Sequence, residues 1–189
     1  MTPFVDRGAV VAAYVGIGVA VTVGVSFLLV IPIEPIFWLL AVPSGLLIGY
    51  YANARANRAM GPWSRILANG VFAGIVTGLT FAVLLLAVKA LFFYADNGYR
   101  DPGLGAPLEC TAGPECVYAR YLDDGRGEAL RDAGVTDTDS FTAFYWNQQL
   151  ATAGTLIALT ALGALGGAAV YGVVRPKARP IDDGARAAG

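Results

Sequence analysis

The chain has 189 residues, of which 56% are hydrophobic and only 14% are charged, and its formal net charge is −1. Soluble domains carry about a quarter of charged residues, so this composition excludes an ordinary soluble protein. The length accommodates several membrane spans, one sizeable loop and short tails, and it leaves no room for a second folded domain.

Four long apolar stretches predict an all-α integral membrane protein with four transmembrane helices. About 20 apolar residues are needed to cross the hydrocarbon core, and each stretch meets or approaches that length. We interpret the first stretch as a retained span, because its apolar run exceeds the roughly 7–15 residues of a signal peptide. The expected spans of this single membrane domain are residues 9–31, 36–52, 66–94 and 150–174.

Charge is sorted between the connecting segments. Ten acidic residues and four arginines lie in the segment 95–147. The other segments that carry basic residues near span ends contain no comparable excess of acidic residues. Lys and Arg close to span ends fix those ends in the cytoplasm. We therefore expect both termini to be cytoplasmic, 95–147 to be one large extracytoplasmic loop and 175–189 to be a cytoplasmic tail. The arginines that determine this topology are Arg55, Arg58, Arg65 and Arg175.

Aromatic side chains mark the expected membrane boundaries. Trp38, Tyr94 and Trp146 stand at the proposed outer ends of three spans. Trp and Tyr prefer the headgroup level, where one edge of the ring is apolar and the other is hydrated. These three residues are predicted interface anchors, in a plasma membrane that we take to be a bacterial inner membrane.

Small residues recur at every fourth position of the spans. This spacing places them on one helical stripe, and such stripes let two helix backbones approach closely in lipid. The sequence leaves open whether the stripes meet each other or a different subunit. In the first and third spans the predicted packing residues are Gly16, Ala20, Gly24, Gly70, Gly74 and Gly78.

Few polar groups interrupt the spans. Lys89 lies close to the outer end of the third span, where its long side chain can reach the interface. Glu34 is interpreted as a turn residue, and Asn69 and Gln149 as polar residues at helix ends. Pro43 predicts a kink in the second span.

The external loop contains the only two cysteines, Cys110 and Cys116. Their short spacing on an oxidising side predicts a structural disulfide bond between them. A short helix over 127–133 is expected to end at Gly134, and Asp139 or Ser140 is expected to cap a helix leading into the fourth span. The acidic residues of the loop lack the spacing of a calcium-binding loop and predict a solvated surface.

The chain contains no histidine, which is the commonest haem ligand and a frequent ligand of zinc and copper. We therefore expect no cofactor bound through histidine and no metal site, while lipid or pigment contacts are not determined by the sequence. No catalytic constellation is recognisable, and we expect no enzymatic activity. The favoured interpretation is a non-catalytic accessory subunit of a membrane complex, such as a respiratory or photosynthetic one. Its partners would be the bilayer and other membrane subunits, with no nucleic acid; the alternative is a small transporter or channel, and a membrane enzyme ranks third.

Overall fold

The structure is a computed structural model that describes residues 5–30, 34–56, 62–95 and 113–174, without the side chains of 27–30 and 34–37. Every regular element in these ranges is helical, and none of the described residues forms a strand. This agrees with the predicted all-α class. The elements are α1 (Arg7–Val30), α2 (Glu34–Arg55), α3 (Trp63–Tyr94), α4 (Pro114–Tyr121), the π-helical turn η1 (Leu122–Arg126), α5 (Gly127–Asp132) and α6 (Thr138–Val174).

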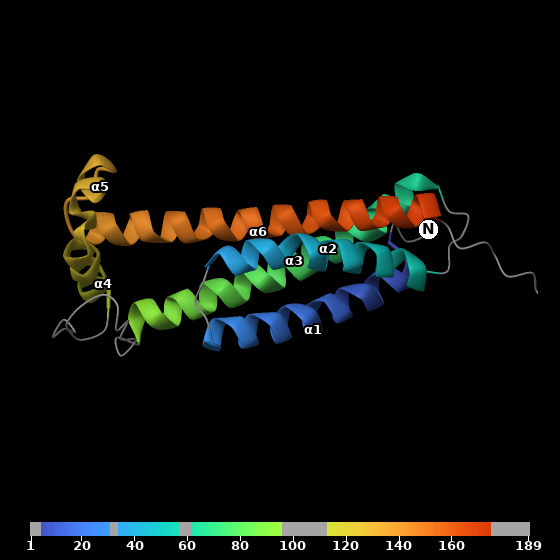
Figure 1. The fold of residues 1–189 in the computed structure, drawn as a ribbon, viewed down its shortest axis with the longest axis horizontal. Coiled ribbons are helices and arrows are strands. Elements are labelled where there is room, and N and C mark those ends of the chain that lie inside the picture. Colours follow the sequence, from blue (N-terminus) through green and yellow to red (C-terminus); the bar gives the residue numbers. More distant parts are fainter. Residues whose placement is uncertain (1–4, 31–33, 57–61, 96–112, 175–189) are drawn as a thin grey trace, which may run out of the picture.

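The four long helices α1, α2, α3 and α6 pack side by side and alternate in direction along the chain (Figure 1). Helix α6 makes its main contacts with α2 and α3, while α1 packs against the other side of that pair. At about 1.5 Å per residue, α3 and α6 are roughly 48 and 55 Å long. They extend beyond α1 and α2 at one end of the bundle, which is on the left in Figure 1.

Three of these helices are long and apolar enough to cross a membrane. The segments are Arg7–Ser26, Trp63–Tyr94 and Thr138–Val174. The predicted crossing by 36–52 stays a prediction: it lies within α2, a continuous helix of 22 residues that includes Pro43, and α2 is not one of the three. The chain therefore has the helical, apolar character of a membrane protein.

Helices α4, η1 and α5 form a cap, defined here as residues 113–137, that lies across the extended ends of α3 and α6 (Figure 1). The short predicted helix is present as α5. It ends where Gly134 adopts a φ of 79°, and the amide of Val135 donates to the carbonyl of Leu130 at 2.9 Å. A left-handed residue at this point is readily supplied by glycine, as the prediction required.

Helix α6 begins at Thr138, and its N-terminal capping residue differs from the prediction. The capping residue is Asp137, not Asp139 or Ser140, because the Asp137 carboxylate accepts a hydrogen bond from the Ser140 amide at 2.8 Å. In return, the Ser140 hydroxyl oxygen accepts from the Asp137 amide at 3.1 Å. Ser140 is thus the third helical residue of a reciprocal capping box. Both candidates considered from the sequence lie inside the helix.

The cap is fixed to the bundle by an apolar core at the end of α3 and the start of α6. The Phe93 ring stacks on Tyr145 at a centroid distance of 4.6 Å, and Phe141 contacts the cap residues Tyr118 and Tyr121 at 5.0 and 5.1 Å. Because Phe93 and Phe141 are almost fully buried, the cap and the helix ends form one packed unit. The buried members of this core are Phe93, Leu130, Val135, Phe141 and Tyr145.

Candidate functional site

The predicted packing glycines of α3 face α6. A Cβ added at Gly70 would lie 2.7 Å from the Ala168 Cβ, and one added at Gly74 would lie 2.5 Å from the Ala164 Cβ. A Cβ added at Gly78 would lie 2.9 Å from the Cα of Ile157 on α6. These stripes therefore meet another helix of the same chain, which is the alternative that the sequence left open.

The stripe of α1 is also turned into the bundle. Ala20 and Gly24 are buried, and a Cβ at Gly16 would collide with the hydroxyl of Thr77 on α3. Helix α2 approaches α6 in the same way, since Cβ atoms at Gly45 and Gly49 would overlap the backbone carbonyls of Thr160 and Ala164. Backbones in direct contact leave no room between these helices for a side chain.

The predicted interface anchors all lie toward the cap end. Trp38 is exposed near the start of α2. Tyr94 and Trp146 contact each other: the rings stack at 6.0 Å, and the Trp146 indole N–H donates to the Tyr94 hydroxyl at 3.2 Å. Tyr94 is 53% exposed, so this pair has the apolar faces and polar edges that suit a membrane boundary.

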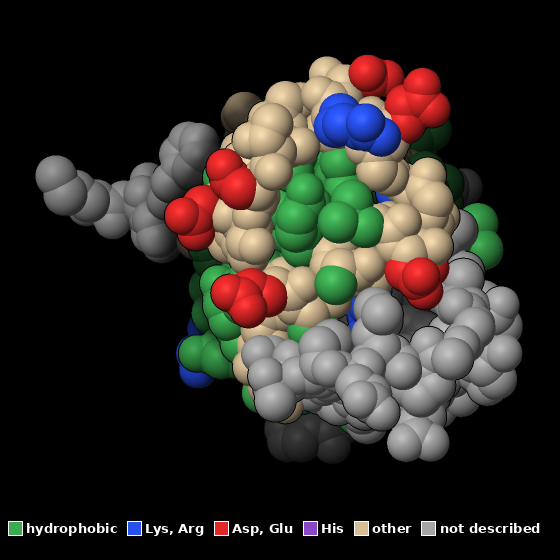
Figure 2. Space-filling view, turned by 90° about the vertical axis from the view of Figure 1, so that its left-hand side faces the viewer, with side chains coloured by type: hydrophobic (Ala, Val, Ile, Leu, Met, Phe, Trp, Pro, Cys, Tyr) green, Lys and Arg blue, Asp and Glu red, His purple; other side chains and the backbone are tan. Residues whose placement is uncertain are grey.

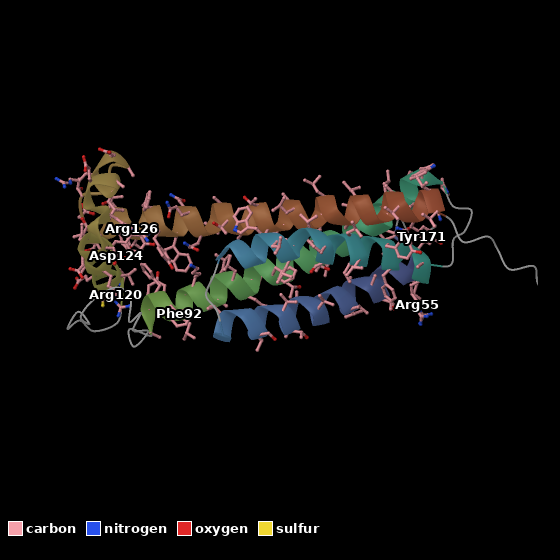
Figure 3. All side chains as sticks on the ribbon, in the orientation of Figure 1. Arg55, Phe92, Arg120, Asp124, Arg126 and Tyr171 are labelled. Carbon is pink, nitrogen blue, oxygen red and sulfur yellow. The ribbon has the colours of Figure 1, made fainter. Side chains whose placement is uncertain are left out.

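The topology arginines that the structure describes lie at the opposite end from the cap. Arg55, labelled in Figure 3, ends α2, and Arg65 lies in the first turn of α3. Arg58 and Arg175 lie outside the described residues, as does the side chain of Glu34. Arg55 and Arg65 are therefore separated by the whole bundle from the acidic residues of the cap.

The predicted disulfide stays a prediction. Cys116 is buried in α4, with 2% of its surface exposed, and Cys110 lies outside the described residues.

A buried polar cluster joins three helices at the arginine end, and sequence reasoning missed it. Asn69 was interpreted as a residue at a helix end, yet it is only 1% exposed. Its carboxamide nitrogen donates to the Asp6 carboxylate at 3.0 Å and to the Asn53 side-chain oxygen at 3.4 Å. Asn53 in turn donates to the carbonyl of Ile66 at 3.0 Å. The entry to α1 and the ends of α2 and α3 are thus held together by side-chain amides.

A periodic signal for this cluster existed in the sequence. Asn69, Ala73 and Thr77 follow one another at every fourth position of α3, and all three are buried. A stripe that continues from an asparagine through small residues such as Ala73 and Thr77 indicates that the asparagine faces a neighbouring helix too. The side chains of Asp6, Asn53 and Asn69 are thus linked by hydrogen bonds to one another and to a helix carbonyl.

A polar pocket of about 610 Å³ lies beneath the cap, between α3, the cap and α6. Lys89 and Arg126 supply its positive charges, and no acidic residue belongs to its described lining. Gln149 also lines the pocket and is only 6% exposed. The sequence predicted that Gln149 lies at a helix end, but it lies well inside α6. The lining residues are Lys89, Tyr121, Arg126, Gln148, Gln149, Ala151 and Thr152.

Two features of this pocket bear on its chemistry. The Arg126 guanidinium carbon lies 4.9 Å from the centre of the Tyr121 ring, an arrangement that orients the cation. The side-chain oxygen of Gln149 is buried and has no hydrogen-bond partner among the described residues. The described lining of the pocket therefore contains two cationic side chains and one buried acceptor without a donor among the described residues.

The described residues contain no group of three His, Cys, Asp or Glu side chains that could hold a metal ion. Outside the helical spans, the pKa of Asp137 is lowered, chiefly because its carboxylate accepts hydrogen bonds from the Ser140 amide and hydroxyl. This carboxylate caps a helix and is exposed. Comparison with family models, curated proteins and solved structures finds no match for this chain.

Proposed function

We propose that this chain is a non-catalytic accessory subunit of a larger membrane complex, such as a respiratory or photosynthetic one, in the plasma membrane. The observation that carries this proposal is the close approach of the helix backbones in the part of the bundle that the structure describes. Gly45 and Gly49 on α2, and Gly74 on α3, bring those helix backbones against α6. A channel or transporter needs polar groups lining a path, whereas this interior is occupied by backbone contacts.

The buried hydroxyls between the helices support the same proposal. Thr77 donates to the carbonyl of Ala73 at 2.9 Å, and Thr160 donates to that of Leu156 at 2.7 Å. Each hydroxyl is thus bonded to its own helix. Hydroxyls bonded in this way are not arranged as successive ligands for a solute.

The orientation within this proposal follows the charges. The ends carrying Arg55 and Arg65 would face the cytoplasm, and the cap would lie outside. Four spans are part of the proposal, with α2 as the remaining crossing. Helix α1 begins and α6 ends at the arginine end (Figure 1), which suits cytoplasmic positions for both termini.

The cap is the surface that we propose for docking. Figure 2 shows its outer face: acidic side chains stand around the rim, and an apolar area lies near the centre. An apolar area with a polar rim is typical of protein-binding surfaces. Because the aromatic core anchors the cap to α3 and α6, this face would be presented in one fixed geometry.

Copurification tests the proposal. The tagged chain, extracted from its own membranes in a mild detergent, should migrate as a stoichiometric complex whose partners are identified by mass spectrometry. A cap variant carrying Asp124→Lys, Glu128→Lys and Asp132→Lys should reduce partner recovery at least tenfold, because it reverses the charge of the rim. The matched control is Ala54→Lys, an exposed position at the opposite end of the bundle.

A chain that purifies alone and monodisperse would contradict the proposal. So would partner recovery that is unaffected by the cap variant while both variants keep wild-type expression and melting temperature. The second candidate is a small transporter or channel, for which the pocket containing Lys89 and Arg126 is the favouring observation. Solute flux in liposomes that is lost in Lys89→Gln would support that candidate.

A further inference from the structure

In the proposed membrane arrangement, the pocket under the cap would lie at the depth of a lipid headgroup. The level is set by a buried layer shared by three helices, Ala41, Leu85 and Leu156. At 1.5 Å per residue, Lys89 stands about 6 Å and Gln149 about 10 Å toward the cap from this layer. Helix α2 begins at Glu34, about 10 Å from the layer in the same direction. Lys89 and Gln149 are therefore close to the level of the first turn of α2, which would lie near the edge of the hydrocarbon if α2 crosses the membrane as proposed.

The aromatic pair Tyr94 and Trp146 indicates the same depth for the pocket. Tyr94 and Trp146 lie one to two helical turns beyond Lys89 toward the cap, and rings of this kind prefer the headgroup region. At the opposite end, Trp63 is exposed at the start of α3, about 39 Å along the helix from Lys89. That length matches a bilayer of about 40–45 Å including its headgroups.

The charges of the pocket favour an anion. Lys89 comes from α3 and Arg126 from the cap, so two separate elements converge on one space. Asp123 and Asp124 belong to the same turn as Arg126, but neither lines the pocket. Figure 3 shows Arg126 where the cap meets α6. A phosphodiester carries one negative charge and oxygen acceptors that suit guanidinium and ammonium donors.

The buried side-chain oxygen of Gln149 points to a second chemical feature of the ligand. An unpartnered buried acceptor is costly, and it is satisfied only by a hydrogen-bond donor. Gln149 lines the pocket and is more than nine-tenths buried. A ligand that supplies both an anionic phosphate and a hydroxyl would complement the two cations and this amide together.

We propose that the pocket binds the headgroup of an anionic glycerophospholipid that carries a free hydroxyl, with the phosphodiester between Lys89 and Arg126 and the hydroxyl donating to Gln149. The chemistry shared with other sources is a phosphate ester bearing a hydroxyl. The lipid is the source to which we commit, because the pocket lies at headgroup depth in a chain with membrane-spanning helices. This site is independent of whether the chain docks to a protein partner.

Native mass spectrometry of the purified full chain tests the site with defined lipids. Phosphatidylglycerol should bind at least tenfold more tightly than phosphatidylcholine, which lacks a net charge and a hydroxyl. Lys89→Gln and Arg126→Gln should each weaken phosphatidylglycerol binding about tenfold. The matched control is Arg131→Gln, an exposed arginine of the cap that does not line the pocket.

The contribution of Gln149 is measured with phosphatidylmethanol, which has the same phosphodiester charge and no hydroxyl. The wild type should prefer phosphatidylglycerol about fivefold, and Gln149→Met should abolish that preference while binding both lipids. Glycerol 1-phosphate and inorganic phosphate, titrated calorimetrically, test the soluble sources and should bind at least a hundredfold more weakly.

Several results would overturn the proposal. Equal affinity for phosphatidylglycerol and phosphatidylcholine would remove the anion requirement, and unchanged binding in the double variant Lys89→Gln/Arg126→Gln would remove the site. A soluble phosphate that binds as tightly as the lipid would reject the lipid as the source. Each variant is first shown to melt within a few degrees of the wild type, and a variant that fails this criterion is replaced by Lys89→Met or Arg126→Met.

Discussion

Asn69 and Asp6, which are 63 positions apart in the chain, hydrogen-bond to each other twice. The Asp6 amide donates to the Asn69 side-chain oxygen at 3.0 Å, and the Asn69 amide nitrogen donates to the Asp6 carboxylate at 3.0 Å. Because Asp6 directly precedes α1 and Asn69 lies inside α3, this pair fixes where α1 enters the bundle. Both side chains are buried, so their hydrogen bonds are shielded from water.

Replacing Asn69 by alanine should destabilise the bundle. The change leaves buried groups of Asp6 and Asn53 without this partner, which typically costs about 1–3 kcal/mol. The free energy of unfolding, measured in detergent by denaturant titration, should fall by that amount. Asn147→Ala serves as the control, because Asn147 is exposed on α6; equal effects of the two variants would argue against the role of the buried cluster.

Two adjacent glycines of α6 should respond in opposite ways to alanine. A Cβ at Gly167 would overlap the carbonyl oxygen of Leu46 on α2, whereas one at Gly166 would meet nothing within 4 Å. Gly167→Ala should therefore lower stability by about 1–3 kcal/mol through overpacking. Gly166→Ala should be neutral or stabilising by up to about 1 kcal/mol, because alanine is the better helix former.

Thermal melting of the two variants in the same detergent checks this prediction. A Gly167→Ala protein as stable as Gly166→Ala would show that α2 and α6 are not in backbone contact.

Asp137, the N-terminal capping residue of α6, should make the stability of the folded protein depend on pH. The folded-state pKa of Asp137 is lowered by the hydrogen bonds from Ser140. Its contribution is therefore present above the ordinary carboxyl pKa, and it is lost as the pH falls through the lowered value. Asp137→Ala should reduce the melting temperature at about pH 7 and have less effect at about pH 2.5.

Asp139→Ala provides the comparison in the same turn, since it removes a carboxylate without removing the two side-chain bonds to Ser140. A loss of stability in Asp137→Ala that is the same at both pH values would contradict the linkage.

Cysteine labelling tests the proposed orientation. Ser64 and Thr136 are exposed at opposite ends of the bundle. In a background with both native cysteines replaced, an impermeant thiol reagent applied to intact cells should modify Thr136→Cys and leave Ser64→Cys unlabelled. Permeabilised cells should label both positions. Modification of position 64 from outside would contradict the proposed orientation.

The predicted bond between Cys110 and Cys116 is checked by intact mass. Freshly purified protein should accept two alkylating groups only after reduction, because a disulfide leaves no thiol to react. Alkylation of both cysteines without reduction would exclude the bond.

The apolar stretches alone were sufficient to predict long helices, because burial of about 20 consecutive apolar residues in lipid needs no information about partners. The glycine that ends α5 was equally readable, since a left-handed residue favours glycine through local sterics. Asp137 was missed for a local reason too: its capping role depends on where the first helical turn begins, and several acceptors compete within four residues of chain.

What only the tertiary structure decided concerns residues that are distant in the chain. Gly74 presents a small surface in any helix, and the fold determined that Ala164 of the same chain occupies it. Asn69 hydrogen-bonds to Asp6 because the packing of α1 against α3 brings these two residues together. The cap places Lys89 and Arg126 around one pocket. The sequence alone could not show this, because the free energy of an electrostatic or hydrogen-bonded site depends on distances that the linear sequence does not contain.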